Sequence, residues 1–557
     1  MNQKTLKIET LLYCLIFFLA LSVRFIHLGQ TPLNDFEAEP AMKALSVSRA
    51  ESAVIGDQPA YVMLTSALFR VFNATDIWAR FWPALAGAAI VLVPYLLRGK
   101  LPGRTGLAAA LFLAVDPALV AISRTAGGQS LAIVFGLLAL SLLMNRKWIA
   151  GGICLGIALS SGQAFWFGTL ILAVVVLIIR IGSTHHASEE SNIKQWGLTA
   201  GVAALTAVLV STGFMFLPNG ITGIANGLVS FVKRWDAISL VTIKTSLIVF
   251  ASTYLPAILL AVFGYLVARK KHPEWAHLLL IWFVAAAVIV IVIPAREVSD
   301  WVWAILPLWG LAALGIIVTL PALARSERVV LLAEFVLTFA LLLFSVLNLM
   351  AYFFNSYGDA VVDRNRLIGA GLPLLLLIIA TAFLAWGWSP KSAIQGLGLG
   401  IGVLLCAWIF SAGMKSAGSL VQPSGIAWKP QPILVDEKLL VSQVEDLSLW
   451  IHGQRHQIDI EVVNYDTPSL RWALRDFSFV TWDLQYSPVE TPSVIIAPDY
   501  QQIGSTTLYR GQGIAWAQYP SYAKMGFSEW MRWIFYRQAP VDEIRLILYA
   551  RNDLFKQ

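Results

Sequence analysis

The chain has 557 residues, of which 58% are hydrophobic and only 13% are charged. Soluble proteins carry about 25% charged residues, so the composition excludes a string of water-soluble domains and requires lipid as the solvent for most of the chain. It also excludes intrinsic disorder and a collagen-like chain, and a disulfide-rich scaffold is excluded because Cys14, Cys154 and Cys406 all lie in apolar runs.

Apolar runs dominate residues 1–414. A helix of about 20 apolar residues crosses the hydrocarbon core of a bilayer, and the sequence holds enough such runs for about 13 transmembrane helices. The first run is expected to stay in the mature chain, since no small-x-small cleavage site follows it. The predicted spans are residues 8–28, 81–98, 106–122, 129–144, 148–163, 165–181, 196–217, 242–267, 276–294, 301–320, 329–350, 367–387 and 395–413.

Basic residues in the short loops predict the orientation, because loops rich in lysine and arginine stay in the cytoplasm. Residues 98–104 and 269–271 carry such residues, whereas residues 218–232 carry none. The pattern predicts a multi-pass protein of the plasma (inner) membrane with a cytoplasmic N-terminus. It places residues 29–80, the first outer loop, and residues 415–557, the tail, on the extracytoplasmic side.

The tail is predicted to form a small soluble α/β domain, because helical and strand-like patterns alternate along it. Its 13 basic and 15 acidic residues contrast with the 27 basic and 18 acidic residues of the rest. The basic excess therefore belongs to the membrane loops, and we expect no nucleic-acid partner. A linker is predicted at residues 421–430, helices at 437–452 and 469–476, and strands at 458–463, 477–484, 493–497 and 506–509.

Three carboxylates lie within five residues of the first outer loop, at Asp35, Glu37 and Glu39. A carboxylate at the membrane surface can act as the general base on an acceptor hydroxyl or amine, or it can help to hold a divalent ion. The simpler interpretation is helix capping by Asn34 or Asp35. The two interpretations are compatible with each other.

Three arginines, Arg80, Arg124 and Arg296, fall on the predicted outer face, against the trend that keeps basic residues inside. The guanidinium group is always charged and binds two phosphate oxygens at once, so a lipid phosphate is a suitable ligand. The alternative is that each side chain reaches to the lipid headgroups. We favour a phosphate site, since all three share one membrane depth.

Asp116 lies within a predicted span, where a carboxylate is costly unless it has a partner. It is therefore a candidate for function, and an equal alternative is helix packing beside Pro117. The seven histidines are scattered without the spacing of a zinc site, so no metal ligands are assigned and a divalent ion is left open as a cofactor. No nucleotide-binding motif is present, which argues against nucleotide-driven transport.

Four stretches together resemble the GT-C superfamily of integral-membrane glycosyltransferases, in its protein O-mannosyltransferase and aminoarabinose-transferase branch. They follow one another in the order and spacing of that branch. The tail segments PSLRWALRD (468–476) and VIIAP (494–498) resemble the soluble domain of relatives described as flippase-activity-associated. The four stretches are RFIHLG running into PLNDFEA (24–38), DQPAY (57–61), ARFWPALAG with DP and SRTAGGQSL (79–131), and Arg296 with WAILP (296–307).

The resemblance implies a GT-C-like fold and transfer of a sugar from a polyprenyl-phosphate donor to an acceptor at the outer membrane face. In the family a carboxylate of the first outer loop activates the acceptor, and basic residues hold the lipid phosphate. Carried over to this sequence, Asp35 is the first choice of base and Glu37 the second. The substrate-binding residues implied are Arg80, Arg124, Arg296, Asp57, Asp116 and Gln129.

The sequence departs from the family at two positions. When Glu37 is aligned with the family's glutamate, the preceding family aspartate falls on Phe36, so that Asp35 is one residue early. Gln58 stands where relatives have histidine or lysine. The alternative function is therefore a non-catalytic protein that binds lipid-linked sugars or assists a flippase. A secondary transporter is a further rival, but it requires more polar groups near the middle of the membrane.

Overall fold

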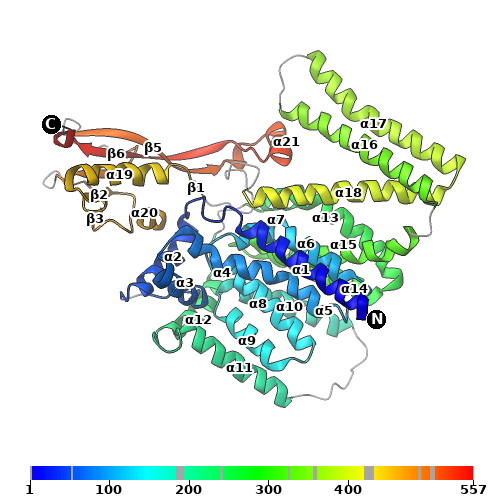
Figure 1. Cartoon of the computed structure of the whole chain (residues 1–557), viewed down its shortest axis with the longest axis horizontal. Coiled ribbons are helices and arrows are strands. Elements are labelled where there is room, and N and C mark those ends of the chain that lie inside the picture. The colour runs from blue at the N-terminus through cyan, green and yellow to red at the C-terminus, as the bar shows by residue number, and fades with distance from the viewer. Residues whose placement is uncertain are drawn as a thin grey trace.

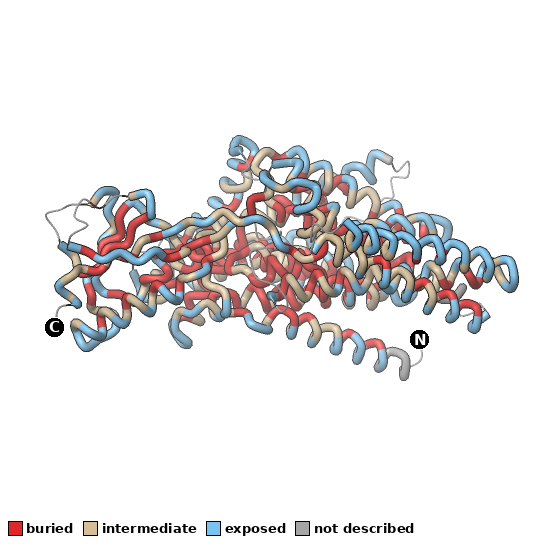
Figure 2. The backbone as a smooth tube through the Cα atoms, turned by 90° about the horizontal axis from the view of Figure 1, so that it is seen from above, coloured by how far each residue is buried: buried red, intermediate tan, exposed pale blue. Residues whose placement is uncertain are grey.

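The computed structural model describes residues 3–51, 54–182, 193–238, 242–323, 327–354, 360–418, 432–486, 491–501, 503 and 508–555. The predicted linker at 421–430 and the first two residues of the strand at 506–509 lie outside these residues. Helices dominate the chain up to residue 418, and a sheet follows (Figure 1). Figure 2 shows buried backbone concentrated in the middle of the molecule and exposed backbone at its periphery.

The predicted multi-pass architecture is confirmed, although the count of 13 spans stays a prediction. Within the described residues, 10 helices are long and apolar enough to cross a membrane, and a pair of helices bent by 56° makes up to 11. Two further predicted spans correspond to apolar helices that are shorter than a full span, α8 and α9. The helices are α1 (Gln3–Phe25), α4 (Asp76–Ala88) with α5 (Leu92–Leu97), the bent pair α6 (Thr105–Val115) and α7 (Pro117–Ser123), α8 (Gln129–Met144), α9 (Trp148–Leu159), α10 (Gln163–Gly182), α11 (Ile193–Ser211), α13 (Ile243–Lys271), α14 (Pro273–Val292), α15 (Val302–Leu323), α16 (Arg328–Phe354), α17 (Ala360–Gly387) and α18 (Pro390–Ser416).

The first outer loop is itself helical, with α2 (Asp35–Ser48) and α3 (Pro59–Phe72), and a further short helix, α12 (Gly220–Lys233), lies beside α3. The Asn34 side chain accepts a hydrogen bond from the Glu37 amide at 3.1 Å, so the predicted capping of this helix is confirmed. Buried side chains of α2 and α3 form a small apolar core. The carboxylates of the loop are therefore held on a folded unit.

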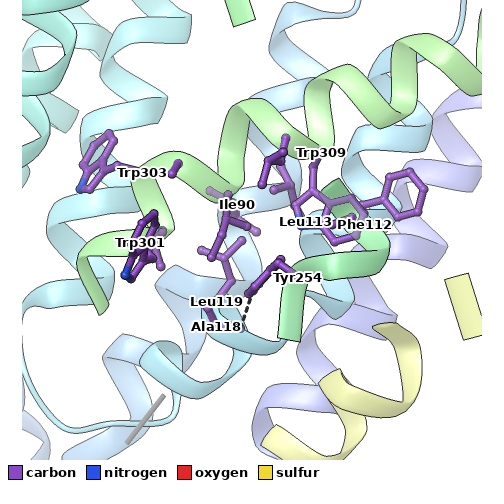
Figure 3. Close-up of a cluster of buried hydrophobic side chains, with 14 of the residues drawn as sticks. Ile90, Phe112, Leu113, Ala118, Leu119, Tyr254, Trp301, Trp303 and Trp309 are labelled. Carbon is purple, nitrogen blue, oxygen red and sulfur yellow. Dashed lines mark hydrogen bonds between the residues drawn. The ribbon is translucent and has the colours of Figure 1, made fainter. Parts of the chain in front are cut away.

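The main core lies where α6, α7, α13 and α15 meet. Trp309 of α15 stacks on Phe112 with 4.5 Å between ring centroids, and Trp301 stacks on Phe250 at 4.1 Å. Tyr254 of α13 lies among these residues and accepts a hydrogen bond from the Ala118 amide at 3.2 Å (Figure 3). Large rings from α6, α13 and α15, together with Trp301 just before α15, pack around the bend between α6 and α7, which positions the segment from residue 116 to residue 129.

The tail contains the predicted α/β arrangement, built on a six-stranded sheet in the order β1-β5-β6-β4-β2-β3. β2 pairs in parallel with β3 and β4, and the other pairs are antiparallel. The predicted helix at 437–452 is observed as α19 (Glu437–His452) and the second as α20 (Pro468–Ala473). The strands are β1 (Ile433–Leu434), β2 (Asp459–Val463), β3 (Phe479–Asp483), β4 (Val494–Pro498), β5 (Tyr509–Pro520) and β6 (Val541–Arg551).

The sequence analysis did not predict β6 or the helix α21 (Phe527–Tyr536) that connects β5 to it. The two strands form a long antiparallel hairpin. In Figure 1 this hairpin runs from the body of the sheet toward α16 and α18, and α21 lies at their ends. The tail therefore contacts the helical part at two separate places, through α20 and through α21.

Candidate active site

Glu37 and Arg80 form a buried ion pair beneath the first outer loop. Arg80 Nε donates to Glu37 Oε1 and Nη2 donates to Oε2, each at 2.7 Å, and both residues are 1% exposed. Glu37 Oε1 also accepts from the Ala126 amide at 3.0 Å. Removing one partner from such a pair leaves an uncompensated buried charge. The pair joins α2, α4 and the turn after α7.

The remaining donors of Arg80 bind the chain that connects α1 to α2. Nη1 donates to the Leu28 and Thr31 carbonyls at 3.2 and 2.6 Å, and Nη2 donates to the Pro32 carbonyl at 3.1 Å. The N–H groups of the Arg80 guanidinium are thus all bound to Glu37 and to backbone oxygens. In this conformation Arg80 holds the loop in place and has no donor directed to a ligand.

Arg124 fills a similar structural position at the end of α1. Its Nη1 donates to the carbonyls of Val23, Arg24 and Ile26 at 3.3, 2.8 and 2.6 Å, and Nη2 donates to the His27 carbonyl at 3.3 Å. The last carbonyls of a helix lack intrahelical partners, and a cation there also opposes the negative end of the helix dipole. Arg124 therefore caps α1.

Asp116 is fully buried at the bend between α6 and α7. Its Oδ1 accepts from the Leu119 amide at 2.8 Å, and Oδ2 accepts from Tyr254 Oη at 2.7 Å and from Trp309 Nε1 at 2.8 Å. These contacts tie α7, α13 and α15 together, which supports the packing interpretation of this carboxylate. Asp116 does not line the cleft described below.

Asp35 differs from Glu37 because it is partly exposed and contacts the tail. Its Oδ1 accepts a hydrogen bond from the Ser469 amide at 2.9 Å, at the first turn of α20. Beside it, Trp472 of α20 is buried and donates from Nε1 to Asp76 Oδ1 at 2.8 Å. The tail thus covers the outer-loop helices directly next to the predicted base.

A cleft of about 350 Å³ opens between α2, α3, the start of α10 and the second half of α12, and we call it the outer-loop cleft. Its polar lining includes Asp57, Glu39 and Lys43, whose Nζ donates to Glu39 Oε1 at 2.8 Å. Gln58 anchors the lip of the cleft, since its Oε1 accepts from the Gly128 amide at 2.7 Å. The other lining residues are Phe36, Pro40, Ile55, Gly56, Val62, Gln163, Asn226 and Ser230.

A polar network adjoins this cleft through Gln163. Gln163 and Gln129 donate to the two oxygens of Glu297 at 3.1 and 3.0 Å. Arg234 forms a buried ion pair with Asp300, one turn after Glu297. Arg296 lies in the same segment, half-buried, and its Nη2 donates to the Ile291 carbonyl at 3.5 Å. The structure therefore brings Gln129 and the segment of Arg296 close to one wall of the cleft.

Comparisons with known proteins agree with this architecture. Residues 44–210 match the family model of dolichyl-phosphate-mannose-protein mannosyltransferase. The chain thus resembles the GT-C superfamily in its mannosyltransferase and ArnT branch, and the family model matches less than half of it. It has the fold of ArnT from Cupriavidus metallidurans bound to undecaprenyl phosphate, with a TM-score of 0.51, 15% identity, and coverage of 98% of this chain and 99% of that one. The apo state of the same ArnT gives a TM-score of 0.52 and 14% identity, with 98% of each chain covered. No curated protein sequence matches the chain.

Several residues of the outer-loop cleft and of the polar network beside it were missed by the sequence analysis. Lys43, Gln163, Arg234 and Glu297 carry no motif of their own, because amphipathic helices and turns commonly hold such residues at the surface. The segment that follows Arg296 contained Glu297 and Asp300, so two acids beside a predicted outer arginine were the available signal. Among the described residues, no three histidine, cysteine, aspartate or glutamate side chains gather as a metal site.

Proposed function

We propose that this chain transfers a sugar from a polyprenyl-phosphate donor to an acceptor at the outer face of the membrane, in the outer-loop cleft. The GT-C fold supports glycosyl transfer at the level of the family, and the ArnT of the same fold binds undecaprenyl phosphate. The observation that carries the proposal is the cleft itself. It places carboxylates and Lys43 together on a folded outer loop that adjoins the apolar helices.

Asp35 is the proposed general base. It removes the proton of an acceptor hydroxyl or amine, the acceptor attacks the anomeric carbon, and the bond to the lipid phosphate breaks with inversion of configuration. Phe36 lines the cleft directly after it, and Asp35 is partly exposed, whereas Glu37 is already neutralised by Arg80. Glu37 is therefore the second choice of base, and its present contacts hold α2 in position.

Cations near the cleft neutralise the phosphate that leaves. Lys43 lines the cleft, and Arg296 lies in the segment that adjoins it. Arg80 and Arg124 remain proposed phosphate ligands only if their present bonds to Glu37 and to backbone carbonyls are exchanged for phosphate oxygens. Asp57 and Gln129 are proposed to orient the sugar or the acceptor by hydrogen bonds, and Asp116 is proposed to act on substrate only through the bend that it stabilises.

The test is transfer from a radiolabelled polyprenyl-phosphate sugar in membranes that hold equal amounts of each variant. A general base contributes about 10²- to 10⁴-fold to rate, so Asp35→Asn is expected to lose activity by that factor. Glu51→Gln, which changes an exposed carboxylate of the same loop, is the matched control and is expected to keep wild-type activity. If Asp35→Asn and Glu37→Gln both keep full activity, the base assignment is wrong.

The alternative function is binding of the lipid-linked sugar without transfer. The observation that favours it is the position of Asp35, one residue away from the aspartate of the family and engaged by the tail. This alternative predicts saturable binding of the labelled donor that is lost in Lys43→Met, with no product from any acceptor fraction. Release of free polyprenyl phosphate together with a glycosylated product would exclude it.

A further inference from the structure

A second polar site lies where α21 of the tail contacts the ends of α16 and α18. Lys415 of α18 donates from Nζ to the Phe535 carbonyl at 3.0 Å, and Arg532 donates from Nε to the Phe353 carbonyl at 3.3 Å. The ring of Phe535 packs edge-on against Trp408, with 5.7 Å between centroids. These contacts belong to helices other than those of the outer-loop cleft (Figure 1).

A cavity of about 110 Å³ remains at this junction. That volume corresponds to roughly three or four water molecules at ~30 Å³ each, which is room for one tetrahedral anion. Lys415, Arg537 and Ser411 contribute its polar wall, and side chains such as Trp408 and Phe535 contribute its apolar wall. The cavity thus combines two cationic side chains with an apolar enclosure.

Arg537 is a buried cation with an unused donor. The residue is 9% exposed, and its guanidinium carbon lies 4.3 Å from the centroid of the Trp533 ring. Its Nη1 is shielded from solvent and has no hydrogen-bond partner among the residues that the structure describes. Burial lowers the pKa of Arg537 to about 10, so the group is still protonated at neutral pH. A buried donor of this kind normally has an acceptor.

Acidic side chains do not supply that acceptor. Within the described part of the chain, neither Lys415 nor Arg537 lies within 4.0 Å of a carboxylate oxygen. The titratable groups that act on Arg537 are the hydroxyls of Tyr522 and Tyr254, which carry no charge at physiological pH. Two cations thus share one enclosure without a protein anion, and that arrangement is costly unless an external anion occupies it.

We propose that this cavity binds the phosphate group of a membrane lipid. Phosphate supplies oxygen acceptors to the ammonium group of Lys415 and to the fork of Arg537 at once. The apolar wall and the adjoining spans α16 and α18 accommodate the lipid chain, which free phosphate lacks. The site goes beyond the proposed sugar transfer, since it is separate from the outer-loop cleft and needs no catalytic step.

Binding can be measured by native mass spectrometry of the purified full-length protein in detergent. The probes are phosphatidic acid, farnesyl phosphate, inorganic phosphate and, as a lipid without an exposed phosphate monoester, phosphatidylcholine. Wild-type protein is expected to bind at least one of the two phosphate-monoester lipids in preference to phosphatidylcholine. Lys415→Met and Arg537→Met are each expected to weaken that binding about tenfold, as loss of a charge-assisted hydrogen bond implies. Lys391→Met, at the exposed opposite end of α18, is the matched control.

Lys415→Arg keeps a positive charge at the site, and this variant is expected to bind the lipid with an affinity within a few-fold of the wild type. If Lys415→Met and Arg537→Met lose binding of farnesyl phosphate alone, the site is assigned to an isoprenyl lipid. If they lose binding of both phosphate-monoester lipids equally, it is assigned to lipid phosphates in general. The proposal is overturned if Lys415→Met and Arg537→Met bind both lipids like the wild type, or if only inorganic phosphate binds. Neither result bears on activity in the outer-loop cleft, which the transfer assay measures separately.

Discussion

The tail rests on the helical part at two places that differ in how their polar groups are satisfied. At the α20 contact, Trp472 donates to Asp76, the Ser469 amide donates to Asp35, and Lys438 donates to the Gln30 carbonyl at 3.1 Å. At the α21 contact, aromatic rings supply most of the surface. There the buried polar atoms Arg537 Nη1, Trp533 Nε1 and Tyr522 Oη have no hydrogen-bond partner within the described residues.

The α20 contact is therefore mainly structural, whereas the α21 contact has buried polar groups that a ligand can satisfy. Buried polar groups in folded proteins are almost always hydrogen-bonded, so unsatisfied ones require an explanation. The α20 contact pairs the polar groups named above and holds the first outer loop against the tail, although Arg475 Nε beside Trp472 also lacks a hydrogen-bond partner within the described residues. The α21 contact has three unsatisfied groups, of which Arg537 lines the cavity together with Lys415, and a bound anion would explain that one.

Truncation of Trp472 is expected to have the largest effect, because it should weaken the α20 contact and leave the α21 contact unchanged. Trp472→Ala removes a buried ring that packs against Phe69 and leaves Asp76 without its indole donor. Large-to-small changes of this kind cost about 3–5 kcal/mol. We expect hydrogen exchange in α2, α3 and α20 to accelerate strongly, while exchange in α21 stays at the wild-type rate.

Trp450→Ala is the control for that experiment, because Trp450 is 66% exposed on α19 of the same domain. It is expected to leave exchange in α2 and α3 unchanged. Equal acceleration in α20 and α21 by Trp472→Ala would show that the two contacts open together, and the distinction between them would then be wrong.

The second largest effect on the α20 contact is expected from raising the pH. Burial, helped by the nearby Asp76, raises the pKa of Glu437 to about 7 from its ordinary 4.5, and Arg475 and Lys438 oppose the shift. The folded chain therefore holds this proton more tightly than the unfolded chain does. Stability falls as pH rises from about 4.5 to about 7 and is level above that.

The size of this effect is about 3 kcal/mol at most, since one pKa unit corresponds to ~1.4 kcal/mol. Hydrogen exchange of α19 and α20, corrected for the intrinsic pH dependence of exchange, measures it. In Glu437→Gln the same window is expected to be flat. A pH dependence that persists in Glu437→Gln would assign the effect to another group.

Two substitutions of Asp35 separate its contact with the tail from its charge. Asp35→Asn keeps an oxygen that can accept from the Ser469 amide, so hydrogen exchange of α20 is expected to match the wild type. Asp35→Ala removes the acceptor and is expected to weaken the contact by about 1 kcal/mol. Both variants lose the proposed base. Transfer activity in Asp35→Asn with an intact α20 contact would contradict the catalytic role alone.

Much of the fold follows from patterns that are local in sequence. The length and hydropathy of the apolar runs predicted the spanning helices, and Asn34 ahead of an amphipathic run predicted the cap of α2. The alternation of helix and strand predicted the core of the tail. β6 and α21 were missed although Gly526 precedes α21 and Pro540 separates it from β6. The tryptophan and phenylalanine residues of α21 are as typical of a strand as of a helix.

The candidate site was less predictable because its contacts join distant parts of the sequence. Glu37 and Arg80 are 43 residues apart, Arg124 binds carbonyls about 100 residues away, and Asp35 and Ser469 are separated by 434. Sequence shows that a charge on the outer face needs a partner, but it does not show which partner. In the structure Arg80 pairs with Glu37 and Arg124 caps α1. Two of the arginines that the sequence suggested as phosphate ligands therefore already bind other groups.

The smallest expected effect concerns Arg532, which joins α21 to the last turn of α16. Its bond to the Phe353 carbonyl is 3.3 Å long and only partly buried, so Arg532→Ala is expected to cost no more than about 1 kcal/mol. The rings of Phe353 and Phe535 stack with 6.1 Å between centroids and remain in the variant. Hydrogen exchange of α21 is expected to rise slightly, and lipid binding at Lys415 and Arg537 is expected to persist. Loss of that binding in Arg532→Ala would mean that the cavity depends on this single hydrogen bond, rather than on aromatic packing with two cations.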